Sequence, residues 1–357
     1  MKMNVSRWEK NLWTGGGAVY RFFASPLGSI YSLAANTRAA LFQKGILKSY
    51  RPRCVVVSVG NLTPGGSGKT PLVLALGKTF SGKGLKTVTL TRGYRGSGKD
   101  RAAVVAPDAD PSVVGDEPAM MARIMPSVPI IRAAQRARGA KTAEEIYNPD
   151  IILLDDGFGH LALARDFDIV VVDALRGFGN CKTIPAGPLR EPISQLKRAD
   201  CVIVTYSNIV ETGRKDELKK VIGKYAPEST VLEAAFRVEG IIRNAGEPPE
   251  PLDLIVGRKV VAFSGIGNPS AFRRTIENLN IEVAAFLSFP DHHYYMDSDI
   301  NDITRALTGA NSSCALTTEK DLARLGKRKF PAELFALRIA VEVERFGWLT
   351  DRILGKS

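Results

Sequence analysis

The sequence predicts an α/β fold: a doubly wound, mostly parallel sheet, preceded by an amphipathic helix and followed by a second, smaller α/β domain. The first supporting observation is that short runs rich in β-branched residues alternate with helical stretches, which is typical of parallel strands covered on both faces. The second is a composition of 45% hydrophobic and 24% charged residues, which is enough to bury a large core. The third is the length, because 357 residues exceed one typical domain and favour two.

The first 53 residues differ from the rest by being basic and aromatic. They hold nine lysine or arginine residues against the single acid Glu9, interleaved with tryptophan, tyrosine and phenylalanine. Over 29–47, apolar residues recur at helical spacing, which predicts a helix. Such a helix is typical of a membrane surface, where it lies at the headgroup level; packing on its own domain is the alternative. No segment reaches the roughly 18 apolar residues that span a bilayer, so the expected membrane contact is peripheral.

Seven apolar runs predict strands of the two domains. A connector that ends in a stretch rich in glycine and proline interrupts the series near 230–255. We therefore expect a membrane-facing arm over 1–53, a core domain over 54–230, a linker over 231–255 and a smaller domain over 256–357. The predicted strands are 54–59, 87–91, 103–106, 151–154, 169–172, 201–205 and, in the second domain, 259–263.

The charge balance and the cysteines narrow the class of protein. Lysine and arginine number 49 against 37 acids, and the net charge of +12 favours a polyanionic partner such as nucleic acid, anionic lipid or a phosphorylated substrate. The four cysteines are widely spaced and include no Cys-x-x-Cys pair. This spacing speaks against a zinc site and against a disulfide-stapled secreted domain, and it favours a reducing cytosol.

The most specific motif follows the first predicted strand of the core domain. An apolar run, a glycine-rich turn and Gly68-Lys69-Thr70 lead into an apolar helix. Glycines let successive backbone N–H groups converge on phosphate oxygens, while the lysine reaches the β and γ phosphates and the threonine hydroxyl ligates Mg²⁺. The usual pattern has glycine where this chain has Thr63. The residues expected to hold a nucleotide are Thr63, Pro64, Gly65, Gly66, Ser67, Gly68, Lys69 and Thr70.

Two acids end the predicted strand at 151–154. Carboxylates at the carboxyl end of a strand beside a phosphate-binding loop are well placed to hold Mg²⁺, so Asp155 and Asp156 join Thr70 as predicted metal ligands. Asp-Asp-Gly is also a common turn sequence, which is the alternative interpretation.

Two further segments carry groups suited to proton transfer. Asp116, at the start of a predicted helix, is either a helix cap or the carboxylate that accepts a hydroxyl proton during phosphoryl transfer. The segment 289–295 holds His292 and His293, two of only three histidines in the chain. Adjacent histidines make a weak metal site, so His292 is interpreted as a proton-handling or carboxylate-orienting group, with a structural role as the alternative.

Arginine-rich loops at 91–96 and 184–192 supply candidate phosphate clamps. Arg92 and Arg95 lie in the first loop, and Arg190 lies in the second. A guanidinium group binds phosphate oxygens bidentately, which is the functional interpretation. The alternative is that both loops are simply solvated and charged.

Taken together, these motifs resemble in type and order those of the tetraacyldisaccharide 4'-kinase family. The resemblance runs from about residue 10 to beyond 325. It is carried by the phosphate loop with its Val-Gly-Asn-Leu-Thr lead-in, Arg92-Gly93-Tyr94, Gly115-Asp116-Glu117-Pro118, Asp155-Asp156-Gly157-Phe158-x-His160, the segment 185–192, Asp291-His292-His293 and Thr318-Glu319-Lys320-Asp321.

The resemblance implies a reaction and a place for it. The family transfers the γ-phosphoryl group of ATP, with Mg²⁺, to the 4'-hydroxyl of an acylated glucosamine disaccharide 1-phosphate in lipid A synthesis. The expected location is the cytoplasmic face of the bacterial inner membrane, and the expected partners are the lipid substrate and an anionic membrane surface, without nucleic acid or an obligate protein partner. The resemblance also implies that a β linker between the domains permits hinged closure.

Roles follow for individual residues where this sequence matches the family. Asp116 activates the hydroxyl with help from His292, Lys69 and Thr70 bind phosphate and Mg²⁺, and Asp155 and Asp156 organise the metal. Arg190 is a further catalytic candidate. Weaker candidates for substrate contact are Arg92, Arg95, Arg136, His160 and Glu191.

Two departures from the family and two rival functions remain to be tested. The family commonly has Gln where this chain has Gly159, and Gly where it has Cys181. These changes bear on a side-chain contact and on the loop conformation before Pro185. The rivals are a switch or partitioning ATPase with a similar phosphate loop, and a nucleic-acid-binding protein suggested by the charge, for which the sequence offers no recognisable reader motif.

Overall fold

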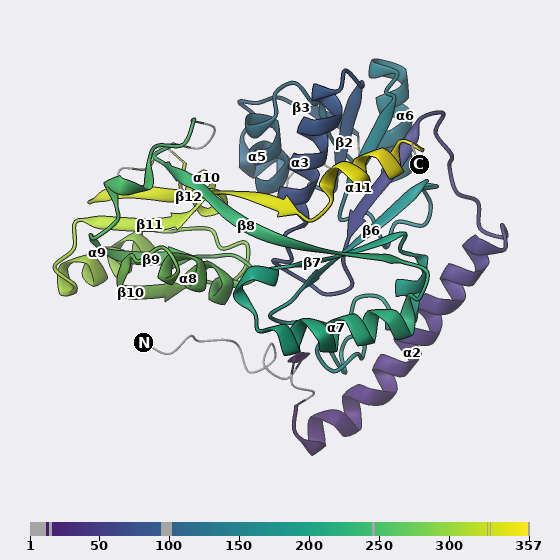
Figure 1. Cartoon of the computed structure of the whole chain (residues 1–357), viewed down its shortest axis with the longest axis horizontal. Helices are drawn as coiled ribbons and strands as arrows, with labels where there is room; N and C mark the ends of the chain where they lie inside the picture. The colour runs from purple at the N-terminus through teal and green to yellow at the C-terminus, as the bar shows by residue number, and fades with distance from the viewer. Residues whose placement is uncertain are drawn as a thin grey trace.

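A twelve-stranded, mostly parallel sheet runs through the molecule (Figure 1). The computed structural model describes residues 12–13, 16–93, 102–244, 247–326, 328 and 330–355. The strand order is β10-β9-β11-β12-β8-β7-β6-β1-β5-β2-β4-β3, and within it β12 and β8, and also β3 and β4, are antiparallel neighbours. The predicted α/β fold is therefore confirmed.

The first seven strands and their helices form what we call the P-loop half. Six of its seven strands lie close to the predicted positions, because each contains a run rich in apolar and β-branched residues; the short β4 was not predicted. They are β1 (Val55–Gly60), β2 (Thr87–Thr91), β3 (Ala103–Val105), β4 (Ile130–Arg132), β5 (Ile151–Asp155), β6 (Phe167–Asp173) and β7 (Cys201–Thr205). The helices are α2 (Ala18–Gln43), α3 (Lys69–Gly82), α4 (Pro111–Val114), α5 (Asp116–Ile124), α6 (Arg136–Tyr147) and α7 (Thr212–Tyr225), with 3-10 turns η1 (Ile193–Arg198) and η2 (Ser207–Ile209).

The remaining elements follow β7 and α7 in the chain. They are β8 (Thr230–Ile242), η3 (Leu252–Leu254), β9 (Lys259–Ser264), α8 (Pro269–Glu277), β10 (Glu282–Ser288), α9 (Asp297–Gly309), β11 (Cys314–Thr318), α10 (Glu319–Leu325), β12 (Glu333–Val343) and α11 (Phe346–Ile353). We call the elements β9–β11 and α8–α10 the second half. Together with β12 they enclose a separate hydrophobic core that includes Ile276, Leu316 and Phe335.

The order of strands places the candidate loop in the middle of the P-loop half. Strand β1 pairs in parallel with β5 on one side and with β6 on the other. The carboxyl ends of parallel neighbours meet at one edge of a sheet, where α/β proteins bind ligands. Val57, Leu72 and Leu153 share the buried core that fixes α3 on this sheet. The loop between β1 and α3 is thereby held at the sheet edge beside the end of β5.

Two long strands connect the halves. Strand β8 pairs in parallel with β7 at its start and antiparallel with β12 over most of its length. The segment 231–255, expected to be a linker, thus begins as an integral strand of the sheet. Backbone hydrogen bonding makes this connection continuous, so the two halves share a single sheet.

The last helix departs from the expected domain boundaries. We expected 256–357 to form the smaller domain, but Leu349 and Ile353 of α11 are buried in the same core as Val57 and Leu72. Lys83, the residue that caps the C-terminus of α3, also forms a 3.0 Å ion pair with Asp351. The amphipathic α11 buries its apolar face against the P-loop half, so that part of the predicted boundary is wrong.

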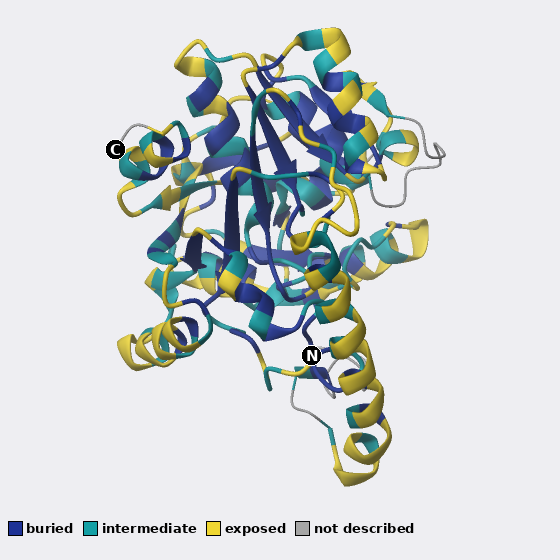
Figure 2. Cartoon of the chain, turned by 90° about the vertical axis from the view of Figure 1, so that its right-hand side faces the viewer, coloured by how far each residue is buried: buried dark blue, intermediate teal, exposed yellow. Residues whose placement is uncertain are grey.

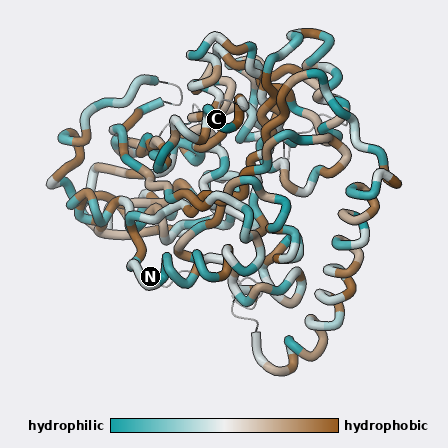
Figure 3. Tube along the Cα trace, turned by 45° about the vertical axis from the view of Figure 1, so that its right-hand side comes forward, coloured by the Kyte–Doolittle hydropathy of each residue, from teal (hydrophilic) through white to brown (hydrophobic). Residues whose placement is uncertain are grey.

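The helix α2 projects from the body of the protein with most of its surface exposed (Figure 2). It begins earlier than the predicted helix at 29–47, and polar and apolar residues interleave along it (Figure 3). Tyr31 donates a 2.7 Å hydrogen bond to the carbonyl oxygen of Arg190, which anchors α2 to the P-loop half. Residues 1–11 and 14–15 of the predicted arm lie outside the described residues. The exposed apolar side chains are Val19, Phe22, Phe23, Leu27, Ile30 and Leu33.

None of the helices in the described ranges combines the length and the apolar character that a membrane crossing requires.

Candidate active site

The loop between β1 and α3 has the backbone of an anion-binding turn. Gly65, Gly66 and Gly68 have φ values of 75°, 37° and 88°, a left-handed region that side chains disfavour. Helix α3 begins at Lys69, so its positive end faces the turn. A 2.8 Å hydrogen bond from the Thr205 hydroxyl to the carbonyl oxygen of Ser67 holds the loop. The predicted glycine-rich turn therefore presents backbone N–H groups at a helix N-terminus.

A cleft of about 780 Å³ lies over this turn, between the two halves of the molecule. Residues 64–71 line it from the P-loop half, and Asp291, His292 and Lys320 line it from the second half. Of the residues predicted to hold a nucleotide, Thr63 is buried and does not line the cleft, whereas 64–70 all do. The cleft brings the phosphate loop and the predicted histidine to one space.

Asp155 and Asp156 line the cleft at the end of β5, but their surroundings differ. Asp155 is 2% exposed, and burial, reinforced by the negative charge of Glu117, raises the pKa of its carboxyl to about 7. Burial acts on Asp156 in the same direction. There the positive charges of Lys69 and Arg190 outweigh it and hold the pKa of the Asp156 carboxyl well below its usual range. Asp156 is therefore ionised at neutral pH.

Arg190 is bound firmly to the phosphate-loop region. Its guanidinium donates two hydrogen bonds to Asp156, at 2.9 and 2.8 Å, and a third to the side chain of Asn61. The Lys69 Nζ lies 3.6 Å from Asp156 Oδ1. Asn61 in turn donates a 2.9 Å hydrogen bond to the Ser67 hydroxyl. Two cations and one carboxylate are thus fixed together at the mouth of the loop.

The acids and Thr70 fit a magnesium ion that is bound together with phosphate. Asp155 Oδ1 is buried and has no hydrogen-bond partner among the described residues, which leaves a strong oxygen ligand available. In the described part of the chain, no three or more His, Cys, Asp or Glu side chains form a metal-binding group. Mg²⁺ commonly takes one or two carboxylates and completes its shell with substrate phosphates and water. The donor set therefore suits Mg²⁺ with a nucleotide better than a metal held by protein alone.

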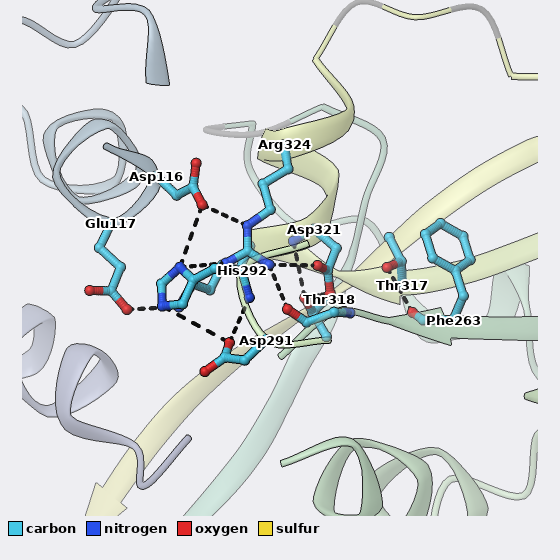
Figure 4. Close-up of polar contacts among 11 residues, drawn as sticks. Asp116, Glu117, Phe263, Asp291, His292, Thr317, Thr318, Asp321 and Arg324 are labelled. Carbon is cyan, nitrogen blue, oxygen red and sulfur yellow. Dashed lines mark hydrogen bonds and ion pairs between the residues drawn. The ribbon is translucent and has the colours of Figure 1, made fainter. Parts of the chain in front are cut away.

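Asp116 lies at the junction of the two halves (Figure 4); unlike its neighbour Glu117, it does not itself line the cleft. Gly115 is the N-cap of α5 and there is no side-chain cap, so the capping interpretation of Asp116 does not hold. Asp116 Oδ2 lies 3.7 Å from His292 Nδ1 and 2.7 Å from Arg324 Nε. Burial acts to raise the pKa of the Asp116 carboxyl, but His292 and Arg324 outweigh it, and the net pKa is lowered. A charged carboxylate thus lies beside an imidazole.

Sequence reasoning missed Arg324 and the ion pair beside it. Lys320 Nζ lies 2.7 Å from Glu117 Oε1, and with Arg324 and Asp116 it joins α10 to α5 across the cleft. The signal was present in the segment that follows β11, since Asp321 and Arg324 are one helical turn apart and form an ion pair at 3.0 Å. Their partners on α5 could not be identified from spacing.

The weaker substrate candidates have mixed outcomes. Arg92 lines the cleft, and Arg95 lies outside the described residues. Arg136 does not line the cleft: it is 2% exposed and donates a 3.1 Å hydrogen bond to the carbonyl oxygen of Asp155. In this structure its side chain supports the end of β5, and a contact with substrate stays a prediction. Burial lowers the pKa of the guanidinium of Arg136 to about 10.

His160 and Glu191 lie away from the cleft, near Gly159. Neither lines the cleft, and burial lowers the pKa of His160 to about 4, so its imidazole is neutral at physiological pH. A Cβ atom placed on Gly159 would lie 3.0 Å from Glu191 Oε1. A glutamine at this position would therefore need Glu191 to shift. Arg38 on α2 donates a 3.3 Å hydrogen bond to the carbonyl oxygen of Gly159.

The departure at Cys181 leaves the loop in a glycine-like conformation. Cys181 has φ of 60°, in the left-handed region that glycine adopts without cost. A cysteine occupies this conformation where the family commonly has glycine. The loop before Pro185 therefore shows the backbone geometry that a glycine would favour.

Comparison with known proteins supports one family. The family model described as tetraacyldisaccharide-1-P 4'-kinase matches residues 20–355. Among curated relatives, the tetraacyldisaccharide 4'-kinase of Anaeromyxobacter sp. (strain K) is 38% identical over 87% of this chain and 82% of its own. That of Syntrophus aciditrophicus (strain SB) is 33% identical over 96% of both chains.

A solved structure agrees with this result. The crystal structure described as the "apo" form of LpxK from Aquifex aeolicus in complex with ATP superposes with a TM-score of 0.73 at 31% identity. It covers 93% of this chain and 97% of that one. The family model and both relatives agree. The chain that carries this phosphate loop, these two strand-end acids and this Asp116–His292 pair therefore belongs to the tetraacyldisaccharide-1-P 4'-kinase family.

Proposed function

We propose that this protein transfers the γ-phosphoryl group of ATP to the 4'-hydroxyl of a tetraacylated glucosamine disaccharide 1-phosphate, forming lipid IVA in lipid A synthesis. The observation that carries the proposal is the cleft that joins the phosphate loop to the region of His292. Phosphoryl transfer needs a donor site and a proton acceptor facing one space. Here the phosphate loop and His292 line the cleft, and Asp116 lies beside them at the junction of the two halves, 3.7 Å from His292 Nδ1.

The donor side consists of Lys69, the loop N–H groups and the strand-end acids. We infer that the loop and Lys69 bind the β and γ phosphates, because an ammonium group and aligned amides neutralise the charge on the transferring group. Thr70, Asp155 and Asp156 would hold Mg²⁺, which when bound neutralises phosphate charge during transfer. Arg190 keeps Asp156 charged and in place through two hydrogen bonds.

The acceptor side consists of Asp116 and His292. As the 4'-hydroxyl oxygen forms its bond to the γ-phosphorus and the bond to the ADP oxygen breaks, the hydroxyl proton passes to Asp116. The low pKa of Asp116 ensures that it is deprotonated at neutral pH. The imidazole of His292 lies beside the carboxylate, with its Nδ1 3.7 Å from Asp116 Oδ2. In-line positioning of the two reactants contributes the rest of the acceleration.

The helix α2 gives the proposed lipid reaction a membrane contact. Its exposed apolar residues include Phe22 and Phe23, and Arg38 lies on the same helix. Aromatic and basic side chains on one helix suit the headgroup region of an anionic membrane. We place the protein peripherally at the cytoplasmic face of the inner membrane. Replacing both phenylalanines with serine should weaken sedimentation with anionic vesicles, and unchanged partitioning would contradict the assignment.

Product analysis distinguishes this function from the switch or partitioning ATPase. Purified protein is incubated with ATP labelled at the γ-phosphate and the disaccharide 1-phosphate lipid. The proposed kinase moves the label to lipid, whereas a switch ATPase releases inorganic phosphate without phosphorylated lipid. The charge of +12 is attributed here to membrane and phosphate binding.

A further inference from the structure

Arg324 occupies a buried position at the junction of the two halves. Its side chain is 3% exposed, although arginine is rarely buried to this extent unless it is paired. The guanidinium donates to Asp116 Oδ2 at 2.7 Å, to the carbonyl oxygen of Gly265 at 2.6 Å and to Asp321 Oδ1 at 3.0 Å. Its Nη2 also lies 3.2 Å from His292 Nδ1 (Figure 4). One side chain therefore touches both members of the proposed proton-transfer pair.

The second half holds this guanidinium in a fixed direction. Asp321 is fully buried and accepts a 3.1 Å hydrogen bond from the N–H of Gly265. The Arg324 guanidinium and, at 3.1 Å, the His292 backbone N–H both donate to the carbonyl oxygen of Gly265. Contacts within the second half therefore fix their relative positions without Asp116.

The contact with His292 restricts the imidazole to one tautomer. A guanidinium group has donors and no acceptor, so a hydrogen bond to Nδ1 requires a lone pair on that nitrogen. His292 then carries its proton on Nε2 when neutral. Protonated Nδ1 cannot be retained while Arg324 donates to it. In this arrangement the cation in direct contact with Asp116 Oδ2 is Arg324, at 2.7 Å.

The charges around Asp116 favour its ionised form. The groups that lower the pKa of Asp116 are His292, Arg324 and Lys320, while Asp321 and Asp291 act on Arg324, and Glu117 pairs with Lys320. Arg324 makes the shortest contact with the carboxylate. An opposite charge in direct contact lowers a carboxyl pKa, typically by about 1 to 3 units.

We propose that Arg324 is a positioning residue for phosphoryl transfer, which holds His292 in the Nε2-protonated form and Asp116 as an oriented carboxylate when the two halves meet. The proposal deepens the proposed function and rests on it. Arg324 does not take up the hydroxyl proton, and acts through Asp116 and His292. Its contribution is to join the proton acceptor on α5 to the histidine loop.

The test uses the full chain with Arg324→Met and Arg324→Lys. We expect Arg324→Met to lower kcat on the order of 10- to 100-fold, the scale of a misplaced catalytic group. Loss of the neighbouring cation raises the pKa of Asp116, so the acid limb of the kcat–pH profile moves upward by about 1 pH unit. Arg324→Lys keeps a charge but cannot reach both partners with one ammonium group. We expect the acid limb of the kcat–pH profile to shift less in Arg324→Lys than in Arg324→Met.

A second measurement reports on the tautomer without using activity. Nitrogen-15 NMR of the three histidine side chains separates protonated from unprotonated ring nitrogens, and His292→Asn assigns the signal of His292. The wild type should show unprotonated Nδ1, and both Arg324 variants should show a mixture of tautomers. Arg305→Lys, on the exposed surface of α9, is the matched control and should change neither readout.

The outcomes separate the two proposals. A wild-type acid limb together with a wild-type His292 tautomer in folded Arg324→Met overturns the role of Arg324. If that variant does not fold, an unchanged tautomer in Arg324→Lys overturns it instead. Failure of the proposed function would appear differently, as wild-type protein that releases phosphate without labelling lipid. The tautomer measurement stays valid in that case.

Discussion

Two polar clusters, one lining the cleft and one beside it at the junction of the two halves, are assembled in different ways. Lys69, Asp156 and Arg190 all belong to the P-loop half, and the first two follow neighbouring parallel strands. Asp116 and Arg324 are 208 residues apart and meet across the two halves. The first cluster exists once one sheet has formed, whereas the second needs the halves in contact. Nucleotide binding and phosphoryl transfer should therefore respond differently to substitution, and this difference can be measured.

The largest effect should come from the P-loop half. Lys69→Ala removes the ammonium group expected to bind the transferring phosphate, and we expect kcat to fall on the order of 10³- to 10⁵-fold, comparable with the loss of other cations at a transferring phosphate. The affinity for ATP should fall as well. Steady-state kinetics and ATP titration measure both. Lys220→Ala, at an exposed position on α7, serves as control, and normal turnover in Lys69→Ala would break the assignment of the donor side.

The next effect should come from the junction and should leave nucleotide binding intact. We expect Asp116→Ala to lower kcat about 10²- to 10⁴-fold, the usual contribution of a general base, with little change in ATP affinity. Asp116→Asn preserves the shape and should lose a similar amount. Turnover near the wild-type value in either variant refutes the role of Asp116. A parallel loss of ATP affinity would show that the two clusters are not independent.

A third substitution tests whether α11 stabilises the P-loop half. Leu349 on α11 is fully buried beside the core residues of the P-loop half. Leu349→Ala should lower the free energy of unfolding by about 2 to 5 kcal/mol, because it leaves a cavity in that core. Denaturant unfolding followed by circular dichroism measures it. Leu254→Ala, at an exposed site in η3, should change stability by less than about 0.5 kcal/mol. Equal losses in both variants would contradict the packing of α11.

The smallest effect concerns the anchor of α2. Tyr31→Phe removes the hydrogen bond from the hydroxyl to the carbonyl oxygen of Arg190. A single hydrogen bond contributes on the order of 1 kcal/mol, so we expect the KM for lipid to rise by about 5-fold or less, with kcat nearly unchanged. A large fall in kcat would mean that α2 helps to position Arg190. Assays with lipid in mixed micelles distinguish these results.

Much of the fold and the donor side could be predicted because local patterns encode them. Apolar runs predicted β2 and β7 with their observed bounds, since strands buried on both faces need continuous apolar sequence. The glycines before Lys69 predicted the phosphate loop, because left-handed backbone geometry favours glycine. The apolar pattern did not predict long β8, because burial alternates along its first half; only the resemblance implied a β linker there. The burial of Arg136 could not be predicted from local patterns, because it depends on what packs above the residue.

The sequence by itself therefore determined the family, the parallel sheet, the phosphate loop and the acids that end β5. These features depend on residues close together in the chain or on neighbouring parallel strands. Only the tertiary structure decided that α11 returns to the P-loop half and that Arg324 lies between Asp116 and His292. The physical reason is that contacts between distant segments depend on how whole elements pack, and no local spacing of residues specifies which side chains then meet.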